Sequence, residues 1–307
     1  MGVIFDVKRM ALRDGPGIRT TVFLKGCSLS CLWCHNPEGQ ASHPELLYDQ
    51  SACLCCRLCE KSCPIGVHRF SEKTHRIDRR RCTACGSCVR VCPSRALRIC
   101  GQEATVKEVL NIVKKDRVFY DTSGGGLTLS GGEPLNQPVF VLEILKAAKR
   151  EQIHTILETN GYWNWHNMAK LLPYVDSIRY DIKHLDSKKH TELTGVSNIQ
   201  ILENLARLVA VGQHLVVVVP LIRGINDDAD NIDALLKFLE SLNYKPVLNL
   251  LPYHDYYQSK SRQLGINARL FSPPSREQMK RIRETAVCRG FEVLNPSAPF
   301  QSQGETA

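Results

Sequence analysis

The sequence of 307 residues lacks any apolar run that approaches the 18 residues of a membrane-spanning helix. No charged segment followed by an apolar one opens the chain, as a secretory signal would. These absences predict a soluble, cytoplasmic protein without a membrane partner. The chain also lacks a phosphate-binding loop, because no Gly-Lys-Ser or Gly-Lys-Thr follows the paired glycines Gly131 and Gly132.

Cysteine, by contrast, is abundant, with 14 residues, most of which fall into three spaced runs. A chain of this length needs no disulfides to bury a core, so the runs predict metal sites and not a disulfide framework. Cys55, Cys100 and Cys288 lie outside the runs and are interpreted as spare or buried thiols.

The first run is Cys27-x3-Cys31-x2-Cys34, directly after the apolar segment 21–24. Three thiolates at this spacing fit on one tight loop and can hold three irons of a cubane [4Fe–4S] cluster. The fourth iron is then open to a small molecule, which would turn an electron carrier into a catalyst. A structural zinc site with His35 as fourth ligand is the alternative, although such sites usually combine two spaced pairs of ligands.

Two further runs share the spacing of bacterial ferredoxins, in which the fourth cysteine of each run binds the other cluster. Each run ends in a cysteine followed by proline, and two full copies favour iron–sulfur clusters over zinc. The crossed pattern predicts two [4Fe–4S] sites, one with Cys53, Cys56, Cys59 and Cys92, the other with Cys82, Cys85, Cys88 and Cys63.

The formal net charge of +9 overstates how basic the loaded protein would be. Three thiolate-bound clusters would lower the charge to about +4. The basic stretch 79–81, just before the second ferredoxin-like run, is interpreted as a solvated face beside anionic clusters. We therefore expect no nucleic-acid partner.

Outside residues 47–100 the chain alternates between short apolar segments and helical patterns. Regular alternation predicts an α/β fold in which crossover helices join parallel strands. Six units are too few for a complete eight-stranded barrel, so a partial (β/α)6 TIM-like barrel is expected. The predicted strands are 20–25, 126–129, 153–158, 177–182, 215–220 and 247–250, and the predicted helices are 104–116, 138–150, 165–172, 198–211, 229–242 and 275–289.

Three parts of the chain follow from this pattern. Residues 1–46 and 101–295 are expected to form the barrel core. Residues 47–100 would form an inserted bacterial-ferredoxin-like domain around two [4Fe–4S] clusters, because they carry little regular pattern. Residues 296–307 are expected to be a flexible tail.

Unusual residues follow the predicted strands, and in barrels of parallel strands chemistry gathers at the carboxyl ends. Asp181 and Lys183 lie two residues apart, so they share a face, where they would either pair with each other or bind something polar. The paired glycines read by default as a turn, and His254 as a loop histidine. The strands end at the first cysteine run, 130–134, 158–161, 181–183, Pro220 and 251–254, which predicts one site.

These features together resemble the radical S-adenosylmethionine superfamily and, more narrowly, the glycyl radical enzyme activating enzymes of the branch with a two-cluster ferredoxin-like insert. The resemblance covers nearly the whole chain except the tail. The motifs that carry it, besides the first cysteine run, are Asp14-Gly15-Pro16-Gly17-Ile18-Arg19-Thr20, Lys25-Gly26-Cys27, Trp33-Cys34-x-Asn36-Pro37-Glu38, Ser123-Gly124-Gly125-Gly126, Ser130–Pro134, Asp181–Lys183 and Leu251–His254.

The resemblance implies an oxidoreductase that reductively cleaves S-adenosylmethionine to methionine and a 5′-deoxyadenosyl radical. This radical would take a Cα hydrogen from one glycine of a partner glycyl radical enzyme. The cluster on Cys27, Cys31 and Cys34 would be the catalytic one, and two auxiliary clusters would bring the total to three. A flavodoxin or ferredoxin-type electron donor and a monomeric state are also implied.

The resemblance assigns further residues to roles. Gly131, Gly132 and Glu133 would receive the methionyl amino group through their backbone. Asp181, Lys183 and His254 would contact the methionyl and ribosyl parts of the cofactor, and Glu158, Thr159 and Asp181 would form a monovalent cation site. The segment that would help hold the glycine loop of the partner comprises Asp14, Gly15, Pro16, Gly17 and Arg19.

One position departs from the family pattern. Many relatives carry an arginine two residues before the proline that ends the fifth strand, where this chain has Val218. Arg223 is the candidate substitute, and Arg223→Ala is expected to lower turnover more than cluster assembly. Unchanged activity would contradict that idea.

Two other function classes remain open at this point. One is a radical enzyme with auxiliary clusters that modifies a small molecule or another peptide, against which the motif 14–20 and the place of the insert argue. The other is a non-catalytic iron–sulfur electron carrier, which leaves the three-cysteine run and the strand ends unexplained. Cleavage of S-adenosylmethionine and a glycine-centred radical on a partner separate the three.

Overall fold

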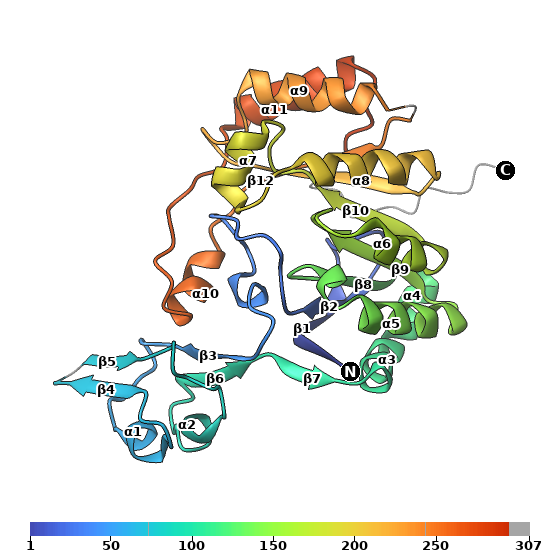
Figure 1. The fold of residues 1–307 in the computed structure, drawn as a ribbon. Helices are drawn as coiled ribbons and strands as arrows, with labels where there is room; N and C mark the ends of the chain where they lie inside the picture. The colour runs from blue at the N-terminus through green and yellow to red at the C-terminus, as the bar shows by residue number, and fades with distance from the viewer. Residues whose placement is uncertain (73, 243, 295–307) are drawn as a thin grey trace.

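The computed structural model describes residues 1–72, 74–242 and 244–294 and is built around one eight-stranded sheet (Figure 1). Six neighbouring strands are parallel and follow the order of the chain, which confirms the predicted α/β class. They are β2 (Arg19–Leu24), β8 (Gly126–Gly131), β9 (His154–Thr159), β10 (Ser177–Asp181), β11 (Leu215–Leu221) and β12 (Val247–Pro252).

Two strands extend the sheet beyond the predicted ones. β1 (Gly2–Ala11) pairs antiparallel with β2, and β7 (Gln102–Ala104) pairs antiparallel with β1. The sequence pattern missed β1 because Asp6, Lys8 and Arg9 interrupt its apolar residues. The sheet is therefore partly parallel, with a mixed edge.

Helices follow most of the parallel strands and bury one apolar face in the core. In α5, for example, Ile144, Leu145 and Ala148 are fully buried. The helices that match predicted segments are α3 (Val106–Val113), α5 (Pro138–Arg150), α6 (Trp165–Leu171), α8 (Ile199–Ala210), α9 (Ala229–Glu240) and α11 (Arg276–Cys288). Outside the cysteine-rich segment, the helices not predicted are α4 (Arg117–Ser123), α7 (Ser187–Thr194) and α10 (Tyr257–Gln263).

The predicted helix over 104–116 is shorter in the structure. It begins with a capping box, in which Thr105 and Glu108 exchange side-chain and backbone hydrogen bonds. It ends at Val113, and the 3-10 turn η2 (Lys114–Asp116) leads into α4.

The cysteine-rich segment leaves the sheet after β2 and returns at β7, and it projects at one end of the molecule (Figure 1). Its helices and strands are four or five residues long, and its small core includes Cys59 and Cys88. Two antiparallel strand pairs and two helices make up the segment: β3 (Glu45–Tyr48) with β6 (Leu97–Cys100), β4 (His68–Ser71) with β5 (Thr74–Ile77), α1 (Leu58–Ser62) and α2 (Ser87–Arg90).

The boundaries at 47 and 100 stay predictions, and the predicted tail at 296–307 lies outside the described residues. Among the residues that the structure describes, no helix combines the length and apolar character needed to cross a membrane.

Candidate functional site

The first cysteine run lies on a closed loop that follows β2. The backbone N–H of Gly26 donates to the carbonyl of Gly39 at 2.8 Å, and that of Cys27 donates to the carbonyl of Gln40 at 3.0 Å. These two bonds bring the ends of the loop together, so that Cys27, Cys31 and Cys34 are presented from one short stretch of backbone.

Gly132 lets the end of β8 pack directly on the ends of this loop. A Cβ atom at Gly132 would lie 2.3 Å from the carbonyl oxygen of Gly26 and 2.4 Å from that of Gly39. Gly131, with φ of +115°, is equally close to the backbone of Leu24. The paired glycines thus have a packing role, and their predicted contact with a cofactor stays a prediction.

The three thiols lie in a buried environment. Burial raises the pKa of Cys27 to about 12 and also raises the pKa of Cys31 and Cys34. Asn160 places its Nδ2 3.5 Å from the sulfur of Cys27. Three such thiols become thiolates when a metal centre replaces their protons, so their chemistry fits a cationic metal group.

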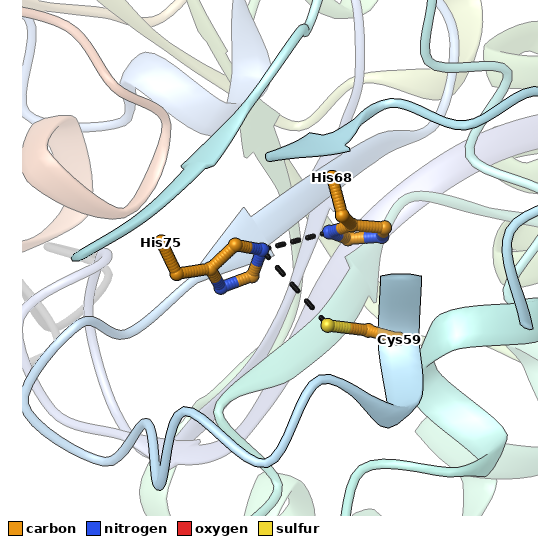
Figure 2. A group of neighbouring side chains, drawn as sticks. All are labelled: Cys59, His68 and His75. Atoms are coloured by element: carbon orange, nitrogen blue, oxygen red, sulfur yellow. Dashed lines mark hydrogen bonds between the residues drawn. The ribbon is translucent and has the colours of Figure 1, made fainter. Parts of the chain in front are cut away.

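The spacing of the sulfur atoms argues against a single zinc ion. Sulfur ligands of one zinc lie within about 4.6 Å of one another. Among the described residues, the one group of three potential ligands within 4.8 Å is Cys59, His68 and His75 (Figure 2). No three cysteines of one set form such a compact group among the described residues.

Lys183 and Asp181 stand next to the cysteine loop at the end of β10. Lys183 Nζ lies 2.8 Å from Asp181 Oδ2, so the ion pair considered from the sequence is formed. Burial lowers the pKa of Lys183, but Asp181 and the cysteine sulfurs outweigh burial and raise it overall. The site therefore holds a fixed positive charge beside Cys31 and Cys34.

Glu133 is fully buried and joins two strand ends. Its carboxylate accepts hydrogen bonds from the backbone N–H of Asn160 at 2.8 Å, the hydroxyl of Thr159 at 2.9 Å and the N–H of Leu135 at 3.1 Å. Burial raises its pKa to about 7, against the opposing effect of these hydrogen bonds. The Glu133 side chain holds the rim together, and its backbone is also engaged: the N–H donates to the carbonyl of Gly26 at 2.7 Å and the carbonyl accepts from Asn136 at 2.9 Å. The predicted backbone contact of Glu133 with the cofactor stays a prediction.

The predicted cation-site residues do not present their side chains to one point. Glu158 accepts hydrogen bonds from Arg179 Nε at 2.7 Å and Ser130 Oγ at 2.7 Å. Thr159, the next residue of the strand, turns its hydroxyl to Glu133 on the other face. With Asp181 bound by Lys183, both carboxylates already face positive groups of the chain.

Arg179 was missed by the sequence analysis. Its guanidinium is almost fully buried and pairs with Glu158. The signal that could have found it is the period of two, since Arg179 lies two residues before Asp181 and therefore on the same face of β10.

His254 stacks on His35 of the cysteine loop, with ring centroids 4.0 Å apart. Burial, followed by the neighbouring His254, lowers the pKa of His35 to about 3. Lys260 of α10, also missed from the sequence, pairs with Glu38 at 2.7 Å and donates to Asn36 at 2.9 Å. The residues that follow β12, a strand at the far edge of the sheet, and α10 thus both contact the cysteine loop.

The end of the segment 14–19 lies against the glycines at 124–126, where β8 begins. Arg19 is fully buried and donates to the hydroxyl of Thr128 at 2.7 Å and to the carbonyls of Leu127 and Pro16. Asp14 accepts from the hydroxyl of Thr21 at 2.7 Å. The Arg19 side chain is engaged in these internal hydrogen bonds. A contact with the partner would therefore be made by the other four predicted residues: Asp14, Gly15, Pro16 and Gly17.

Val218 is buried in β11 between Asp181 and Asn249, its neighbours on the adjacent strands. The side chain of Arg223, the candidate substitute, is exposed, and its backbone N–H donates to Ser272. Asn226 was not predicted, yet its side chain donates to the carbonyls of Lys183 and Pro220 and so joins two strand ends.

The cysteine-rich segment contains two cavities. The cysteines on the walls of the first are Cys53, Cys56, Cys59 and Cys92. The cysteines on the walls of the second are Cys63, Cys82, Cys85 and Cys88. The fold thus groups the eight residues in the crossed sets that the spacing predicts.

Residues 21–239 match the family model described as Radical SAM superfamily. The chain is 46% identical over 260 residues to the isethionate sulfite-lyase activating enzyme of Oleidesulfovibrio alaskensis, covering 82% of this chain and 84% of that one. It is 41% identical over 297 residues to the choline trimethylamine-lyase activating enzyme of the same organism, covering 94% and 96%. A solved radical SAM methyltransferase from Sphaerobacter thermophilus shares the fold, with a TM-score of 0.50 and 16% identity over 90% of this chain and 65% of that chain.

A family model over more than half of the chain and full-length relatives above 40% identity agree with the closed three-cysteine loop at the end of a parallel sheet. The chain therefore belongs to the radical SAM superfamily and, within it, to the activating enzymes of glycyl radical enzymes.

Proposed function

We propose that this protein uses S-adenosylmethionine to place a radical on one glycine of a partner glycyl radical enzyme. The observation that carries the proposal is the closed loop with Cys27, Cys31 and Cys34, which lies beside the Lys183–Asp181 pair. Cys27, Cys31 and Cys34 would hold a [4Fe–4S] cluster, which would supply the electron for reductive cleavage of the sulfonium to methionine and a 5′-deoxyadenosyl radical.

The residues of the chain then have distinct tasks. Lys183 and Asp181 offer opposite charges beside the cluster ligands, which suits the carboxylate and amino groups of a methionyl moiety. Glu133 holds the ends of β8 and β9 in register, so that the backbone of Gly131 and Gly132 can approach the same moiety. His254, stacked on His35, suits contact with the ribosyl part.

The finer architecture belongs to the same proposal. The parallel strands β2 and β8–β12 would form a partial (β/α)6 barrel, which excludes water yet admits a glycine loop at its open side. The segment 47–100 would be a ferredoxin-like domain with two auxiliary [4Fe–4S] clusters, supported by its two cysteine-lined cavities. A flavodoxin or ferredoxin-type donor, a monomeric state and a cytoplasmic location complete the proposal.

Of the features that the family resemblance implies, the monovalent cation site of Glu158, Thr159 and Asp181 has the least support from the side-chain positions. Arg179 and Lys183 already pair with the two carboxylates. A cation would have to compete with these fixed charges, so no step of the proposal depends on it.

The test begins with protein reconstituted without oxygen, in which iron and sulfide are counted and zinc is measured. With dithionite and S-adenosylmethionine, about 12 irons and formation of 5′-deoxyadenosine are expected. Cys31→Ala should abolish product, whereas Cys288→Ala, a matched change at an exposed cysteine outside the runs, should not.

The second stage adds a glycyl radical enzyme and records the electron paramagnetic resonance spectrum. Isethionate sulfite-lyase and choline trimethylamine-lyase are the partners to try first, because the relatives are named for them. A glycine-centred radical supports the proposal. Formation of 5′-deoxyadenosine without a radical on any partner would favour an enzyme that modifies small molecules or other peptides. Bound iron without formation of 5′-deoxyadenosine would favour a non-catalytic electron carrier.

A further inference from the structure

Two buried histidines lie between the two cysteine-lined cavities. His68 on β4 is fully buried and His75 on β5 is 5% exposed. The strands pair as a hairpin, in which His68 lies opposite Ile77 and Phe70 opposite His75. His68 Nδ1 and His75 Nε2 are 2.8 Å apart, so the rings share a hydrogen bond (Figure 2).

Each ring also reaches one of the cavities. His75 lines the first, and its Nδ1 lies 3.7 Å from the sulfur of Cys53. His68 lines the second, and its Nε2 is buried without a hydrogen-bond partner among the described residues. Val67, next to His68, donates its N–H to the sulfur of Cys63 at 3.4 Å. The pair therefore extends from one cysteine set to the other.

Packing fixes the orientation of His75. Phe70 stacks on its ring with centroids 4.2 Å apart, and Tyr48 meets the ring edge-on at 4.6 Å. A buried, oriented pair with an unused nitrogen needs an explanation, because leaving a buried donor or acceptor without a partner destabilises the fold.

A metal ion held by Cys59, His68 and His75 does not provide that explanation. Their ligand atoms lie within 4.8 Å of one another. However, His68 Nδ1 and His75 Nε2 already bond to each other at 2.8 Å. Cys59, whose sulfur lies 3.9 Å from His75 Nε2 (Figure 2), belongs to the first cysteine set. The unused Nε2 of His68 would still lack a partner.

The hydrogen count of the pair limits what it can donate. A neutral imidazole has one N–H and one acceptor nitrogen. The 2.8 Å contact between His68 Nδ1 and His75 Nε2 needs one nitrogen to donate and the other to accept, as in a pair of neutral rings. Of the two N–H groups, one makes the bond between the rings. The other then points outward, either from His75 Nδ1 or from His68 Nε2.

We propose that His68 and His75 are a hydrogen-bond bridge that offers its outward N–H to either auxiliary cluster, but not to both at once. The inference rests on the proposed auxiliary clusters and deepens that function. An N–H donor favours the more negative, reduced state of the cluster that it contacts. Reduction of one cluster therefore draws the N–H to it and makes the other cluster harder to reduce.

The exchange is balanced. When one electron passes between the clusters, one is oxidised and the other is reduced. In the exchange the hydrogen between the rings passes from one ring to the other, one outward nitrogen releases a proton to water, and the other outward nitrogen takes a proton up from water. Each ring keeps one hydrogen in both arrangements, so no net proton is taken up or released. The bridge thereby favours a single electron in the pair of clusters over two.

The test is a redox titration of the reconstituted holoenzyme, followed by electron paramagnetic resonance. Signals are assigned with Cys31→Ala, Cys56→Ala and Cys85→Ala, each of which removes a ligand of a different cluster. His75→Phe should lower the reduction equilibrium constant of the first-set cluster about tenfold, or about 59 mV, without lowering that of the second. His68→Phe should show the reverse pattern.

The matched control is His166→Phe, an exposed histidine on α6 far along the chain from the insert, which should shift neither potential. Full iron with unchanged potentials in both variants, or equal shifts of both clusters in each variant, would overturn the bridge while leaving the auxiliary clusters in place. An insert that holds zinc or no iron would instead overturn the clusters themselves.

A measurement on the wild-type chain keeps the inference testable if the phenylalanine variants lose iron. Protein labelled with 15N-histidine should give a 15N coupling to the reduced insert cluster in pulsed resonance experiments. A reduced cluster with no coupled ring nitrogen would contradict the bridge.

Discussion

At the scale of single residues, the site depends on charged and polar side chains that are buried for a structural reason. Glu133, Arg19 and Arg179 are all almost fully inaccessible, and each holds backbone or side-chain groups of the strand ends. Buried groups of this kind are tolerated because they are hydrogen-bonded, and losing a partner costs more than the bond itself contributes.

Glu133 should make stability depend on pH. Its folded pKa of about 7 lies above the ordinary value of 4.5, so the stability it contributes is full below 4.5 and is lost as pH rises through 7. Between pH 6 and pH 8 the free energy of unfolding should fall by about 1 kcal/mol from this group. Urea unfolding of anaerobic holoprotein measures it, and Glu133→Gln, which cannot ionise, should lack that fall. An identical slope in both proteins would contradict the assignment.

Lys183→Met should separate cluster assembly from turnover. The three cysteines remain, so iron content should be unchanged, but Asp181 loses its partner and Cys31 and Cys34 lose the nearby positive charge. We expect the rate of 5′-deoxyadenosine formation to fall at least about tenfold. Lys188→Met at an exposed position is the control, and Lys183→Arg should restore part of the rate. A full rate in Lys183→Met would remove Lys183 from the site.

At the scale of elements, the rim is assembled by contacts between the ends of neighbouring strands. β8 meets the cysteine loop through Gly132, β9 meets β8 through Glu133, and Asn226 ties the end of β10 to that of β11. α10 also contacts the cysteine loop, through the ion pair of Lys260 with Glu38. Parallel strands bring their carboxyl ends to one edge, which is why these contacts can form.

Gly132→Ala should open the cysteine loop. The new Cβ would lie less than 2.5 Å from two backbone carbonyls, which cannot move without separating the loop from β8. Iron should fall by about four of 12 per chain, with the clusters of the insert retained. Gly212→Ala, where nothing lies within 4 Å of the added atom, is the control and should keep all of the iron despite its strained φ. Full iron in Gly132→Ala would contradict the packing role.

At the scale of the whole molecule, two parts of the chain differ in what holds them together. The sheet and its helices share one large apolar core. The described residues of the cysteine-rich segment have short elements and a small core that includes cysteines themselves. We expect a segment with so little apolar burial to depend on the two proposed clusters for order.

Removal of iron should therefore loosen the insert before the sheet. In hydrogen–deuterium exchange, residues 49–96 should lose protection after anaerobic chelation, whereas β8, β9 and β10 should keep theirs. The untreated holoprotein is the reference. Equal protection of the segment with and without iron would show that its protein contacts alone order it.

Local patterns in the sequence were enough to identify the cysteine runs, the alternation of strands and helices, and the motifs at the strand ends. This is because ligand spacing and strand–helix periodicity are properties of neighbouring residues. The crossed cysteine sets belong to this group, and the cavities contain the same residues. The antiparallel strands β1 and β7 at one end of the sheet were not predicted, since a half-exposed strand with charged residues, such as β1, carries little apolar signal.

Contacts between distant segments decided the rest. The Arg179–Glu158 pair joins two strands, Lys260 reaches the cysteine loop from more than 200 positions along the chain, and the His68–His75 pair meets only because a hairpin folds back on itself. Each of these residues looks ordinary in its own stretch of sequence. Their function depends on which groups burial brings together, and that is a property of the folded chain and not of any local pattern.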